Sequence, residues 1–406
     1  MGKRDGSIAT KIKERVVREF FRTHSYQKKN VVDDLITERP FDYSPALEDT
    51  FFEAMRWSFN HHFSNCVFFK KLCGYRSFDA SRLNSFQDVW DIPFILTDVF
   101  KNYKIETKTG DLLRAEFTSS GTSGKKSRIF LDIISGQRLL YTIYYIHQSL
   151  GLLGEGKANY LLISYNPAID DTIGTSQTDV MMSYLVPSKS VFYALDTKGA
   201  GDITFLKNEA VENLHSFVSD GSPIRVLGFI HHICEIIKSY FMKYGVLKFP
   251  KDSFIVTGGG WKGPINPYGE DFDLFRFLKE HTTLDAANYR DLYTLNEHAV
   301  FYMECERHNK HIPNVSLACA RSPRTLKRLD YGQTGLIHLY SPIIESSPLL
   351  SILTTDYGYV GKSCDCRLGG PYIKIVGRAG LTRGTTCAVT ADKFIEKAEK
   401  KESIAV

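Results

Sequence analysis

The sequence has no apolar run long enough to cross a membrane as a helix. No window in its 406 residues approaches the roughly 18–20 unbroken apolar residues that such a helix needs. The first seven residues lack the apolar core of a secretory signal, and Gly6 stands where an N-myristoylation motif has a hydroxyl residue. We therefore expect a cytoplasmic protein without a transmembrane segment.

Cysteine and positive charge are also too sparse to define a structural class. The 8 cysteines are spaced irregularly in a large chain, which excludes a disulfide scaffold and favours a reduced protein. The formal net charge is only +5, and no dense basic tract follows the pattern of nucleic-acid-binding proteins, so we expect no nucleic-acid partner. The hydrophobic fraction of 43% and the charged fraction of 24% are those of a packed globular protein.

The chain is expected to begin with an N-terminal helical region, residues 1–90. Residues 8–30 carry apolar side chains at helical spacing among Lys, Arg and Glu, which predicts an amphipathic surface helix. Residues 45–72 look helical and are rich in aromatic side chains. We interpret this aromatic stripe as core, because such a stripe is more often packed than functional.

Strand patterns then alternate with helical patterns, which predicts crossover units and an α/β core with mostly parallel sheets over residues 91–334. The expected strands are Tyr160–Tyr165, Val191–Ala194, Ile224–Phe229 and Phe254–Val256, and the expected helices are Gln137–Leu150, Glu209–Ser219 and His231–Tyr244. Residues 335–378 predict a smaller β-rich segment, with runs at Gly335–Tyr340, Leu350–Thr354 and Tyr372–Val376. Residues 379–406 read as a short charged tail.

The most informative segment is the Ser-, Thr- and Gly-rich run Glu116–Ser127. It offers many backbone N–H and hydroxyl groups with little steric bulk, which suits an anion such as phosphate. Walker A is excluded because only two residues separate Gly121 from the Gly124–Lys125 pair, and the dinucleotide fingerprint is absent. A flexible surface linker is the alternative, but the apolar run Ile129–Ile134 follows where a linker would stay polar.

This segment resembles the phosphate-binding loop of adenylate-forming enzymes, the superfamily of acyl-CoA synthetases and luciferases. The resemblance implies that the loop embraces the phosphates of ATP, through Thr118, Ser119, Ser120, Gly121, Thr122, Ser123 and Gly124. The superfamily usually has a lysine shortly after the last glycine. Here Lys125 and Lys126 come early and Ser127 is near the usual lysine position. Lys126 is our candidate for the catalytic lysine.

Two further blocks resemble the adenine-binding motifs of that superfamily. Thr257–Gly263 is similar to its glycine turn, which implies that Gly258, Gly259 and Gly260 lie flat against the base, as a backbone without Cβ atoms can. Asp291–His298 is similar to the motif Tyr-Gly-x-Thr-Glu, although Thr294 replaces the usual glycine. The match implies that Tyr293 stacks on adenine, Asn296 lies by the α-phosphate and Glu297 helps to hold Mg²⁺.

The last two blocks lie near the end of the chain. Thr354–Gly358 looks like the Thr-Gly-Asp block, which implies that Asp356 takes both ribose hydroxyls, and Val376–Arg378 resembles the Gly-Arg before the hinge to a small domain, with Arg378 as its arginine. Each block is weak alone, because Asp356 can be a turn residue and Glu297 a solvated helix residue. Their order and spacing make the signal, which covers residues 90–390.

Few residues follow Arg378, so we expect a truncated C-terminal lid. This short form resembles the acyl-protein synthetases (LuxE-like), the ligase subunit of the bacterial bioluminescence fatty acid reductase complex. In that family a cysteine near the C-terminus accepts the acyl group, which implies Cys387 as the catalytic nucleophile, since a thiolate readily attacks an activated carbonyl. A small buried residue beside Val389 is the alternative interpretation of Cys387.

The resemblance implies a ligase that uses ATP and Mg²⁺ to activate a fatty acid, or another carboxylic acid, to acyl-AMP and then forms a thioester. An acyl-CoA or aryl-CoA ligase and an inactive scaffold in an acyl-processing complex are the alternatives. An acyl-accepting reductase or carrier protein is the implied partner. His231, His232 and His298 are candidates for proton handling, although a lone histidine is more often structural.

A second group of residues in the C-terminal third has the composition of a zinc site. Two cysteines at Cys-x-Cys spacing, with a distant cysteine and histidine, predict a structural zinc site at Cys305, His311, Cys364 and Cys366. Related phenylacetate-CoA-ligase-like proteins carry comparable positions. The alternative is a set of reduced cysteines near a β-turn.

Overall fold

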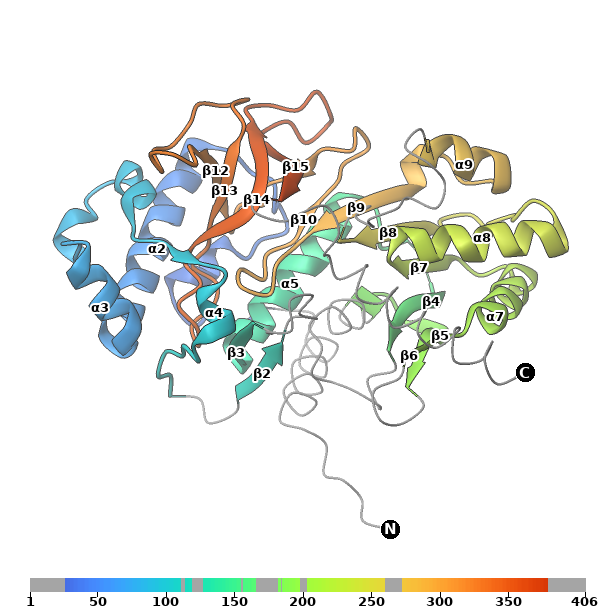
Figure 1. Ribbon diagram of the computed structural model, residues 1–406, viewed down its shortest axis with the longest axis horizontal. Coiled ribbons are helices and arrows are strands. Elements are labelled where there is room, and N and C mark those ends of the chain that lie inside the picture. The colour runs from blue at the N-terminus through green and yellow to red at the C-terminus, as the bar shows by residue number, and fades with distance from the viewer. Residues whose placement is uncertain are drawn as a thin grey trace, which may run out of the picture. The chain divides into compact units, whose positions relative to one another are not determined.

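The computed structural model describes residues 26–110, 114–118, 127–154, 156–165, 182–183, 185–197, 203–259 and 272–378 (Figure 1). These residues form two compact units. Unit 1 contains the described parts of 26–118, 127–150 and 294–378, and unit 2 those of 151–293. The contacts therefore divide the chain at other places than the expected boundaries near residues 90 and 334, because strands from distant parts of the sequence share one sheet in unit 1.

Unit 1 is built on a largely antiparallel sheet. Its strands follow the order β11 (Lys310–His311), β15 (Tyr372–Arg378), β14 (Ser351–Gly361), β13 (Gly335–Tyr340) and β12 (Leu317–Arg321), and β1 (Ile95–Leu96) pairs parallel to β14. Strands β12 to β15 follow one another along the chain, and each pairs antiparallel with the next. The strands expected within residues 335–378 are confirmed. The antiparallel pairing is therefore centred on the β-rich segment that the sequence predicts separately from the parallel core.

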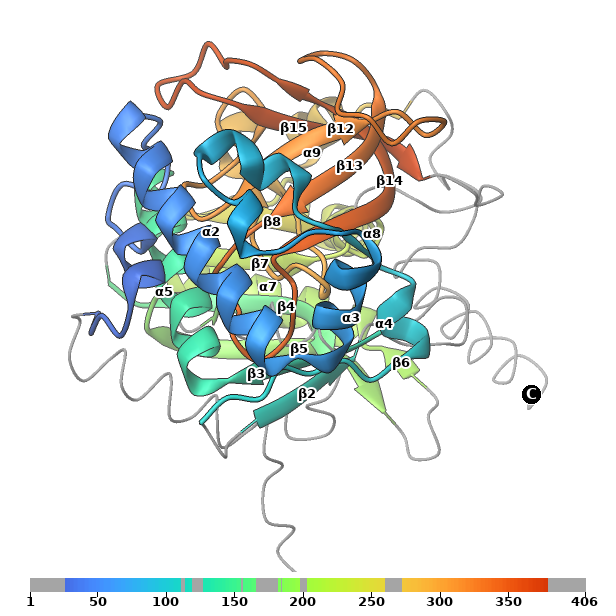
Figure 2. The same cartoon turned by 90° about the vertical axis from the view of Figure 1, so that its left-hand side faces the viewer.

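The helices of unit 1 include the aromatic-rich region of the sequence. They are η1 (Val31–Leu35), α2 (Pro45–Asn65), α3 (Val67–Tyr75), η2 (Ala80–Arg82), η3 (Phe86–Asp91), α4 (Val99–Asn102) and α5 (Ile133–Ser149). Helices α2 and α3 lie side by side (Figure 2), because the extended backbone of Cys66 breaks the expected single helical stretch. Phe59 and Phe69 are fully buried and meet edge to face at 5.6 Å, so part of the stripe is core as expected.

The N-terminal part of unit 1 departs from the helix expected over residues 8–30. Residues 26–29 have no regular secondary structure, and residues 8–25 of that expected helix lie outside the described residues. A buried ion-pair cluster holds this segment. Nε of Arg138 in α5 lies 2.6 Å from Oδ1 of Asp33, and Nη1 of Arg138 lies 2.7 Å from Oε1 of Glu345. All three side chains are at most 9% exposed.

A two-stranded hairpin carries the expected phosphate loop. Strands β2 (Arg114–Thr118) and β3 (Arg128–Asp132) pair antiparallel, with Thr118 opposite Arg128 at the end that leads into the loop. Asp132 then caps α5 by accepting a hydrogen bond from the amide of Ser135 at 2.9 Å. The helix therefore starts at Ile133, four residues before the expected Gln137, because one apolar run passes from strand to helix.

Unit 2 is a mostly parallel sheet with helices. The strand order is β9 (Tyr289–Tyr293), β8 (Phe254–Gly258), β7 (Ile224–Gly228), β4 (Ala158–Tyr165), β5 (Ser188–Thr197) and β6 (Ile203–Phe205), in which only the β5–β6 pair is antiparallel. Its helices are α7 (Lys207–Asp220), α8 (Ile230–Tyr244), α9 (Leu274–His281) and η4 (Ala286–Asn288). The strands and helices that the sequence predicts here are confirmed, and the short strand β10 (Tyr302–Met303) follows in unit 1.

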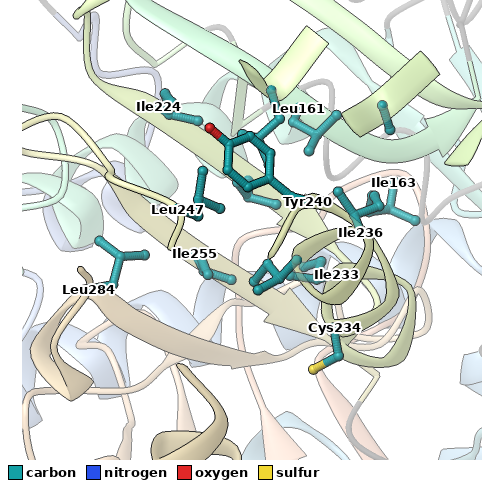
Figure 3. Packing of buried hydrophobic residues seen from close by; sticks show 14 of the residues in the cluster. Leu161, Ile163, Ile224, Ile233, Cys234, Ile236, Tyr240, Leu247, Ile255 and Leu284 are labelled. Carbon is teal, nitrogen blue, oxygen red and sulfur yellow. The ribbon is translucent and has the colours of Figure 1, made fainter. Parts of the chain in front are cut away.

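The core of unit 2 explains why its elements were predictable. Every residue of β7 is buried, as expected for a central parallel strand covered on both faces. Ile233, Ile236 and Tyr240 of α8 pack with Ile224 and Ile255 of the sheet in one apolar cluster (Figure 3). Among the described residues, no helix is both long enough and apolar enough to span a bilayer.

Candidate adenylate-forming site and metal cluster

The carboxyl ends of three parallel strands of unit 2 bring the two adenine-binding motifs to one edge of the sheet. Gly228 at the end of β7 is in register with Thr257 of β8, and Gly258 is in register with Leu292 of β9. In open α/β sheets, ligands bind outside the carboxyl ends of the strands. The expected base-binding residues Gly258, Gly259 and Tyr293 therefore emerge at the edge where a nucleotide is expected, while Gly260 lies outside the described residues.

A buried hydrogen-bond chain fixes the starts of these two motifs relative to each other. The Thr257 hydroxyl donates to Oδ1 of Asp291 at 2.8 Å, so the Tyr289 hydroxyl donates to Thr257 Oγ1 at 2.6 Å. Thr257 is 2% exposed, which strengthens these bonds by excluding water. The glycine turn and the segment that leads to Tyr293 are thus held in one arrangement.

Two glycines at this edge have backbone conformations that other residues rarely adopt. Gly228 has φ +140°, and a Cβ there would overlap the Cβ of Ile163. Gly259 has φ +81°, and a Cβ there would lie 3.4 Å from Cε1 of Phe229. Phe229 therefore lies beside the glycine turn, in the segment that the sequence suggests as a wall of the acid pocket.

In unit 1, the base of the phosphate loop meets the expected Mg²⁺ ligand. Ser127 is fully buried, and its hydroxyl donates a hydrogen bond to Oε1 of Glu297, whose residue is 7% exposed. Thr118 is the last residue of β2. The other loop residues expected to bind ATP lie outside the described residues, as does the candidate lysine; they are Ser119, Ser120, Gly121, Thr122, Ser123, Gly124 and Lys126.

The last two expected nucleotide ligands are neighbours in the antiparallel sheet of unit 1. Asp356 of β14 and Arg378 of β15 are directly opposite each other. Asp356 is 1% exposed, and its amide donates to the Thr354 hydroxyl at 3.1 Å. Asn296 lies in the turn of residues 295–298, which is closed by a 3.1 Å bond from the His298 amide to the Leu295 carbonyl. Cys387 lies outside the described residues.

The candidate proton-handling histidines have structural surroundings. Burial lowers the pKa of His298 to about 3, and its Nε2 lies 2.7 Å from the Tyr302 hydroxyl. Burial also holds the pKa of His232 well below its usual value, and the His231 ring centroid lies 4.0 Å from that of His232. For His298 and His232, imidazoles kept neutral by burial are typical of core packing, the interpretation that a lone histidine favours.

The four residues of the predicted zinc site meet in unit 1. The sulfur and nitrogen atoms of Cys305, His311, Cys364 and Cys366 all lie within 4.8 Å of one another. Sγ of Cys305 and Sγ of Cys364 are 3.9 Å apart, and Sγ of Cys366 is 3.2 Å from Nε2 of His311. Zinc bonds of about 2.3 Å to sulfur and 2.0 Å to nitrogen in a tetrahedron require separations close to these.

The turns around the cluster point backbone N–H groups at the sulfur atoms. The amide of Arg307 donates to Cys305 Sγ at 3.3 Å, and that of Leu368 donates to Cys366 Sγ at 3.4 Å, in each case from two residues further along the chain. Burial raises the pKa of Cys305 to about 12. Burial also opposes ionisation of Cys364, but hydrogen bonds, chiefly from the Asn309 side chain, outweigh it and lower that pKa.

Sequence reasoning missed one residue of this cluster. The Tyr43 hydroxyl lies 3.4 Å from Nδ1 of His311 and donates to the Ile312 carbonyl at 3.0 Å. Because that hydroxyl proton goes to the carbonyl, Nδ1 is the donor to Tyr43, which leaves the Nε2 lone pair facing the sulfur atoms. No motif marks Tyr43, which stands 268 residues from His311, and only its position in the folded structure connects it with the cluster.

Known proteins resemble this chain along most of its length. The family model described as acyl-protein synthetase, LuxE, matches residues 24–395. The long-chain-fatty-acid–luciferin-component ligase of Aliivibrio fischeri is 26% identical over 394 residues, which are 92% of this chain and 98% of the relative. The ligase of the same name from Vibrio harveyi is 27% identical over 311 residues, 75% of this chain and 78% of the relative.

Solved structures share the fold. A 2-hydroxyisobutyryl-CoA ligase in complex with 2-HIB-AMP and CoA has a TM-score of 0.64 at 13% identity, over 89% of this chain and 75% of that one. The same enzyme in its postadenylation state gives 0.62 at 12% identity, over 88% and 74%. This likeness confirms the expected adenylate-forming fold. Together with the match over residues 24–395, it means that the chain belongs to the acyl-protein synthetase (LuxE) family.

Proposed function

We propose that this protein is an ATP-dependent acyl-protein synthetase that activates a fatty acid and transfers the acyl group to Cys387. The family match over residues 24–395 carries the proposal, because it spans every motif described above. The register of β8 with β9, which brings the glycine turn and Tyr293 to one sheet edge, supports a nucleotide site. The names of these two relatives favour a long-chain fatty acid as the substrate class.

The proposed reaction has two steps. A fatty carboxylate oxygen attacks the α-phosphorus of ATP, the bond to the bridging oxygen breaks, and pyrophosphate leaves. The Cys387 thiolate then attacks the acyl carbon and AMP leaves with the bonding electrons, which forms a thioester. The protein's part is to position ATP and to stabilise charge. The resemblance implies roles for Gly259 and Tyr293 toward the base, for Asp356 toward the ribose and for Lys126 toward the phosphates.

The residues at the phosphate-loop base fit Mg²⁺. Glu297 and Ser127 offer a buried carboxylate and a hydroxyl, which are the hard oxygen donors that Mg²⁺ prefers. When bound, Mg²⁺ neutralises charge on the phosphates of ATP. We infer that Glu297 is the ligand, with Asn296 next to it toward the α-phosphate.

Incubation with ATP and labelled fatty acid, without CoA, tests the proposal. We expect label on the protein that hydroxylamine releases, and no such thioester in Cys387→Ala. Cys319→Ala is the matched control, because Cys319 is a buried cysteine that takes no part in the metal cluster. Hydroxylamine-labile label that persists in Cys387→Ala would contradict the assignment of the acceptor.

The same experiment separates the two alternatives. Label that appears only when CoA is added, and then on CoA, would make the protein an acyl-CoA or aryl-CoA ligase. Absence of acid-dependent exchange of pyrophosphate into ATP, over carboxylic acids of graded length, would favour an inactive scaffold. The onward acceptor that we infer, a reductase or carrier protein, is tested by transfer of label from the acylated protein. The cytoplasmic location that we infer is tested by cell fractionation.

We also infer that Cys305, His311, Cys364 and Cys366 hold a structural zinc ion. The ligand-atom separations and the two N–H···S bonds support this, because closed four-ligand sites of this composition are typical of structural zinc. Protein purified without chelators is expected to carry about one equivalent of zinc by this four-ligand rule. Cys364→Ser should lose the metal and Cys73→Ser, at a buried cysteine outside the cluster, should keep it. Less than a tenth of an equivalent in wild type would refute the idea.

A further inference from the structure

Ser127 is the last residue of the Ser-, Thr- and Gly-rich segment and lies near the place where the superfamily usually has a lysine. It is fully buried and bonded to Glu297, a residue 170 positions away in the sequence. A buried serine hydroxyl that meets the expected metal ligand is a specific contact, because a buried carboxylate needs hydrogen-bond partners to remain ionised.

The structure holds the Ser127 hydroxyl firmly in place. Ser127 directly precedes β3, where Arg128 pairs with Thr118. Strand β3 is held in turn by serine side chains: Ser347 Oγ accepts from the Phe130 amide at 2.9 Å, and Ser346 Oγ accepts from the Asp132 amide at 3.0 Å. The loop base is thus anchored to a buried segment of the same unit, so Ser127 is a fixed point against which Glu297 is aligned.

We propose that Ser127 is a positioning residue that holds the Glu297 carboxylate for the divalent cation of MgATP. The inference rests on the proposed function. The hydroxyl donates to Oε1 and so fixes the plane of the carboxylate, whose two oxygens together offer about four lone-pair sites. A carboxylate oxygen held in this way is a hard donor of the kind that Mg²⁺ prefers.

Metal binding gives the direct test. Mn²⁺ binding in the presence of ATP, followed by electron paramagnetic resonance, is expected to weaken about 10- to 100-fold in Ser127→Ala, which is typical when a residue that orients a metal ligand is lost. Ser127→Thr keeps the hydroxyl and should stay near wild type. Ser341→Ala is the matched control, since it removes another buried serine hydroxyl, bonded at 2.7 Å to the Val315 carbonyl.

A double-mutant cycle separates positioning from general stability. In a Glu297→Gln background, Ser127→Ala is expected to have no further effect on Mn²⁺ binding, because the group that it positions is gone. Full additivity, or unchanged Mn²⁺ binding in Ser127→Ala, would overturn the proposal. The concentration of Mg²⁺ that half-saturates pyrophosphate exchange should rise in parallel, with the KM for the acid unchanged.

The two proposals fail in different ways. If wild type exchanges no pyrophosphate with any acid but Ser127→Ala still weakens Mn²⁺ binding with ATP, the synthetase function falls and the positioning role stands. If wild type is acylated and Ser127→Ala binds Mn²⁺ normally, the synthetase function stands and the positioning role falls. Ser127→Thr that melts at the wild-type temperature and binds Mn²⁺ as weakly as the alanine variant also overturns the positioning role.

Discussion

Replacing Arg138 by methionine should destabilise unit 1 strongly. The guanidinium is fully buried and lies 2.6 Å from Asp33 and 2.7 Å from Glu345, and it donates to the Asn30 side chain at 3.0 Å. Methionine fills much of the volume but leaves two carboxylates without their cation. Removing one partner of a buried pair typically costs about 3–5 kcal/mol. For a unit of this size, we expect a midpoint roughly 10 °C lower.

The stability that Arg138→Met loses should be smaller at low pH than at neutral pH. Burial alone raises the pKa of Asp33, but the hydrogen bond and the charge of Arg138 outweigh it and hold that pKa below its usual value. In wild type, the contribution of Asp33 is therefore present above the unfolded pKa and lost as pH falls through the folded one. In Arg138→Met the hydrogen bonds that Tyr26 and the Asn30 amide donate to Asp33 remain, but the charge and the hydrogen bond of Arg138 are gone, so the pKa of Asp33 rises and the variant gains relative stability as pH falls. The difference between wild type and variant should shrink below about pH 5.

Thermal unfolding by circular dichroism at pH 7.5 and at pH 4.5 gives the measurement. Arg56→Met is the control, because Arg56 makes an exposed pair with Glu53 at 2.7 Å, and such pairs contribute about 0–1 kcal/mol. A loss below 1 kcal/mol in Arg138→Met, or a loss that is the same at both pH values, would refute the reasoning.

Three further outcomes follow from the structure. Tyr43→Phe leaves the His311 N–H without its acceptor and should weaken zinc binding about 10- to 100-fold in a chelator competition, with Tyr331→Phe on the surface unchanged. Gly228→Ala should cost more than about 1 kcal/mol in denaturant unfolding, because a Cβ would overlap Ile163 at an unfavourable φ; a neutral result would contradict the packing. Burial lowers the pKa of His298 to about 3, whereas in the unfolded chain that pKa is about 6.5, so below this pH the unfolded chain binds more protons than the folded one. The free energy of unfolding should therefore decrease as pH falls below about 6.5, by up to about 1.4 kcal/mol per pH unit. This decrease should be smaller in His298→Gln.

The sequence predicts unit 2 well because its signals are local. Strand β7 is a short, mostly apolar run with all five residues buried, and α8 follows it with apolar residues at helical spacing. Unit 1 is less predictable because its sheet joins distant segments. Strand β1 is only Ile95–Leu96, and its identity as a strand depends on pairing with Ile352 and Leu353. No local pattern of two residues can carry that information.

The candidate site likewise contains residues that the sequence predicts and residues that only the structure identifies. Cys305, His311, Cys364 and Cys366 are predictable as a group because thiols and imidazole have few other uses in such spacing, and the structure brings their ligand atoms together. Tyr43 is not predictable, because its hydroxyl contributes one hydrogen bond that depends on tertiary packing alone. Likewise, a serine in a loop has many roles, and only the buried contact with Glu297 distinguishes Ser127.

The hairpin of β14 and β15 has a consequence for how the chain finds its native pairing. Its closed end carries Cys364 and Cys366, and its open end carries Asp356 opposite Arg378. A slip of one residue would turn every side chain of β15 to the other face of the sheet, so Ile373, now fully buried, would change places with its neighbours. The sulfur atoms of Cys364 and Cys366 meet Cys305 and His311 only in the correct alignment. The cysteine–histidine cluster therefore favours the native register of β15, the strand that leads toward Cys387.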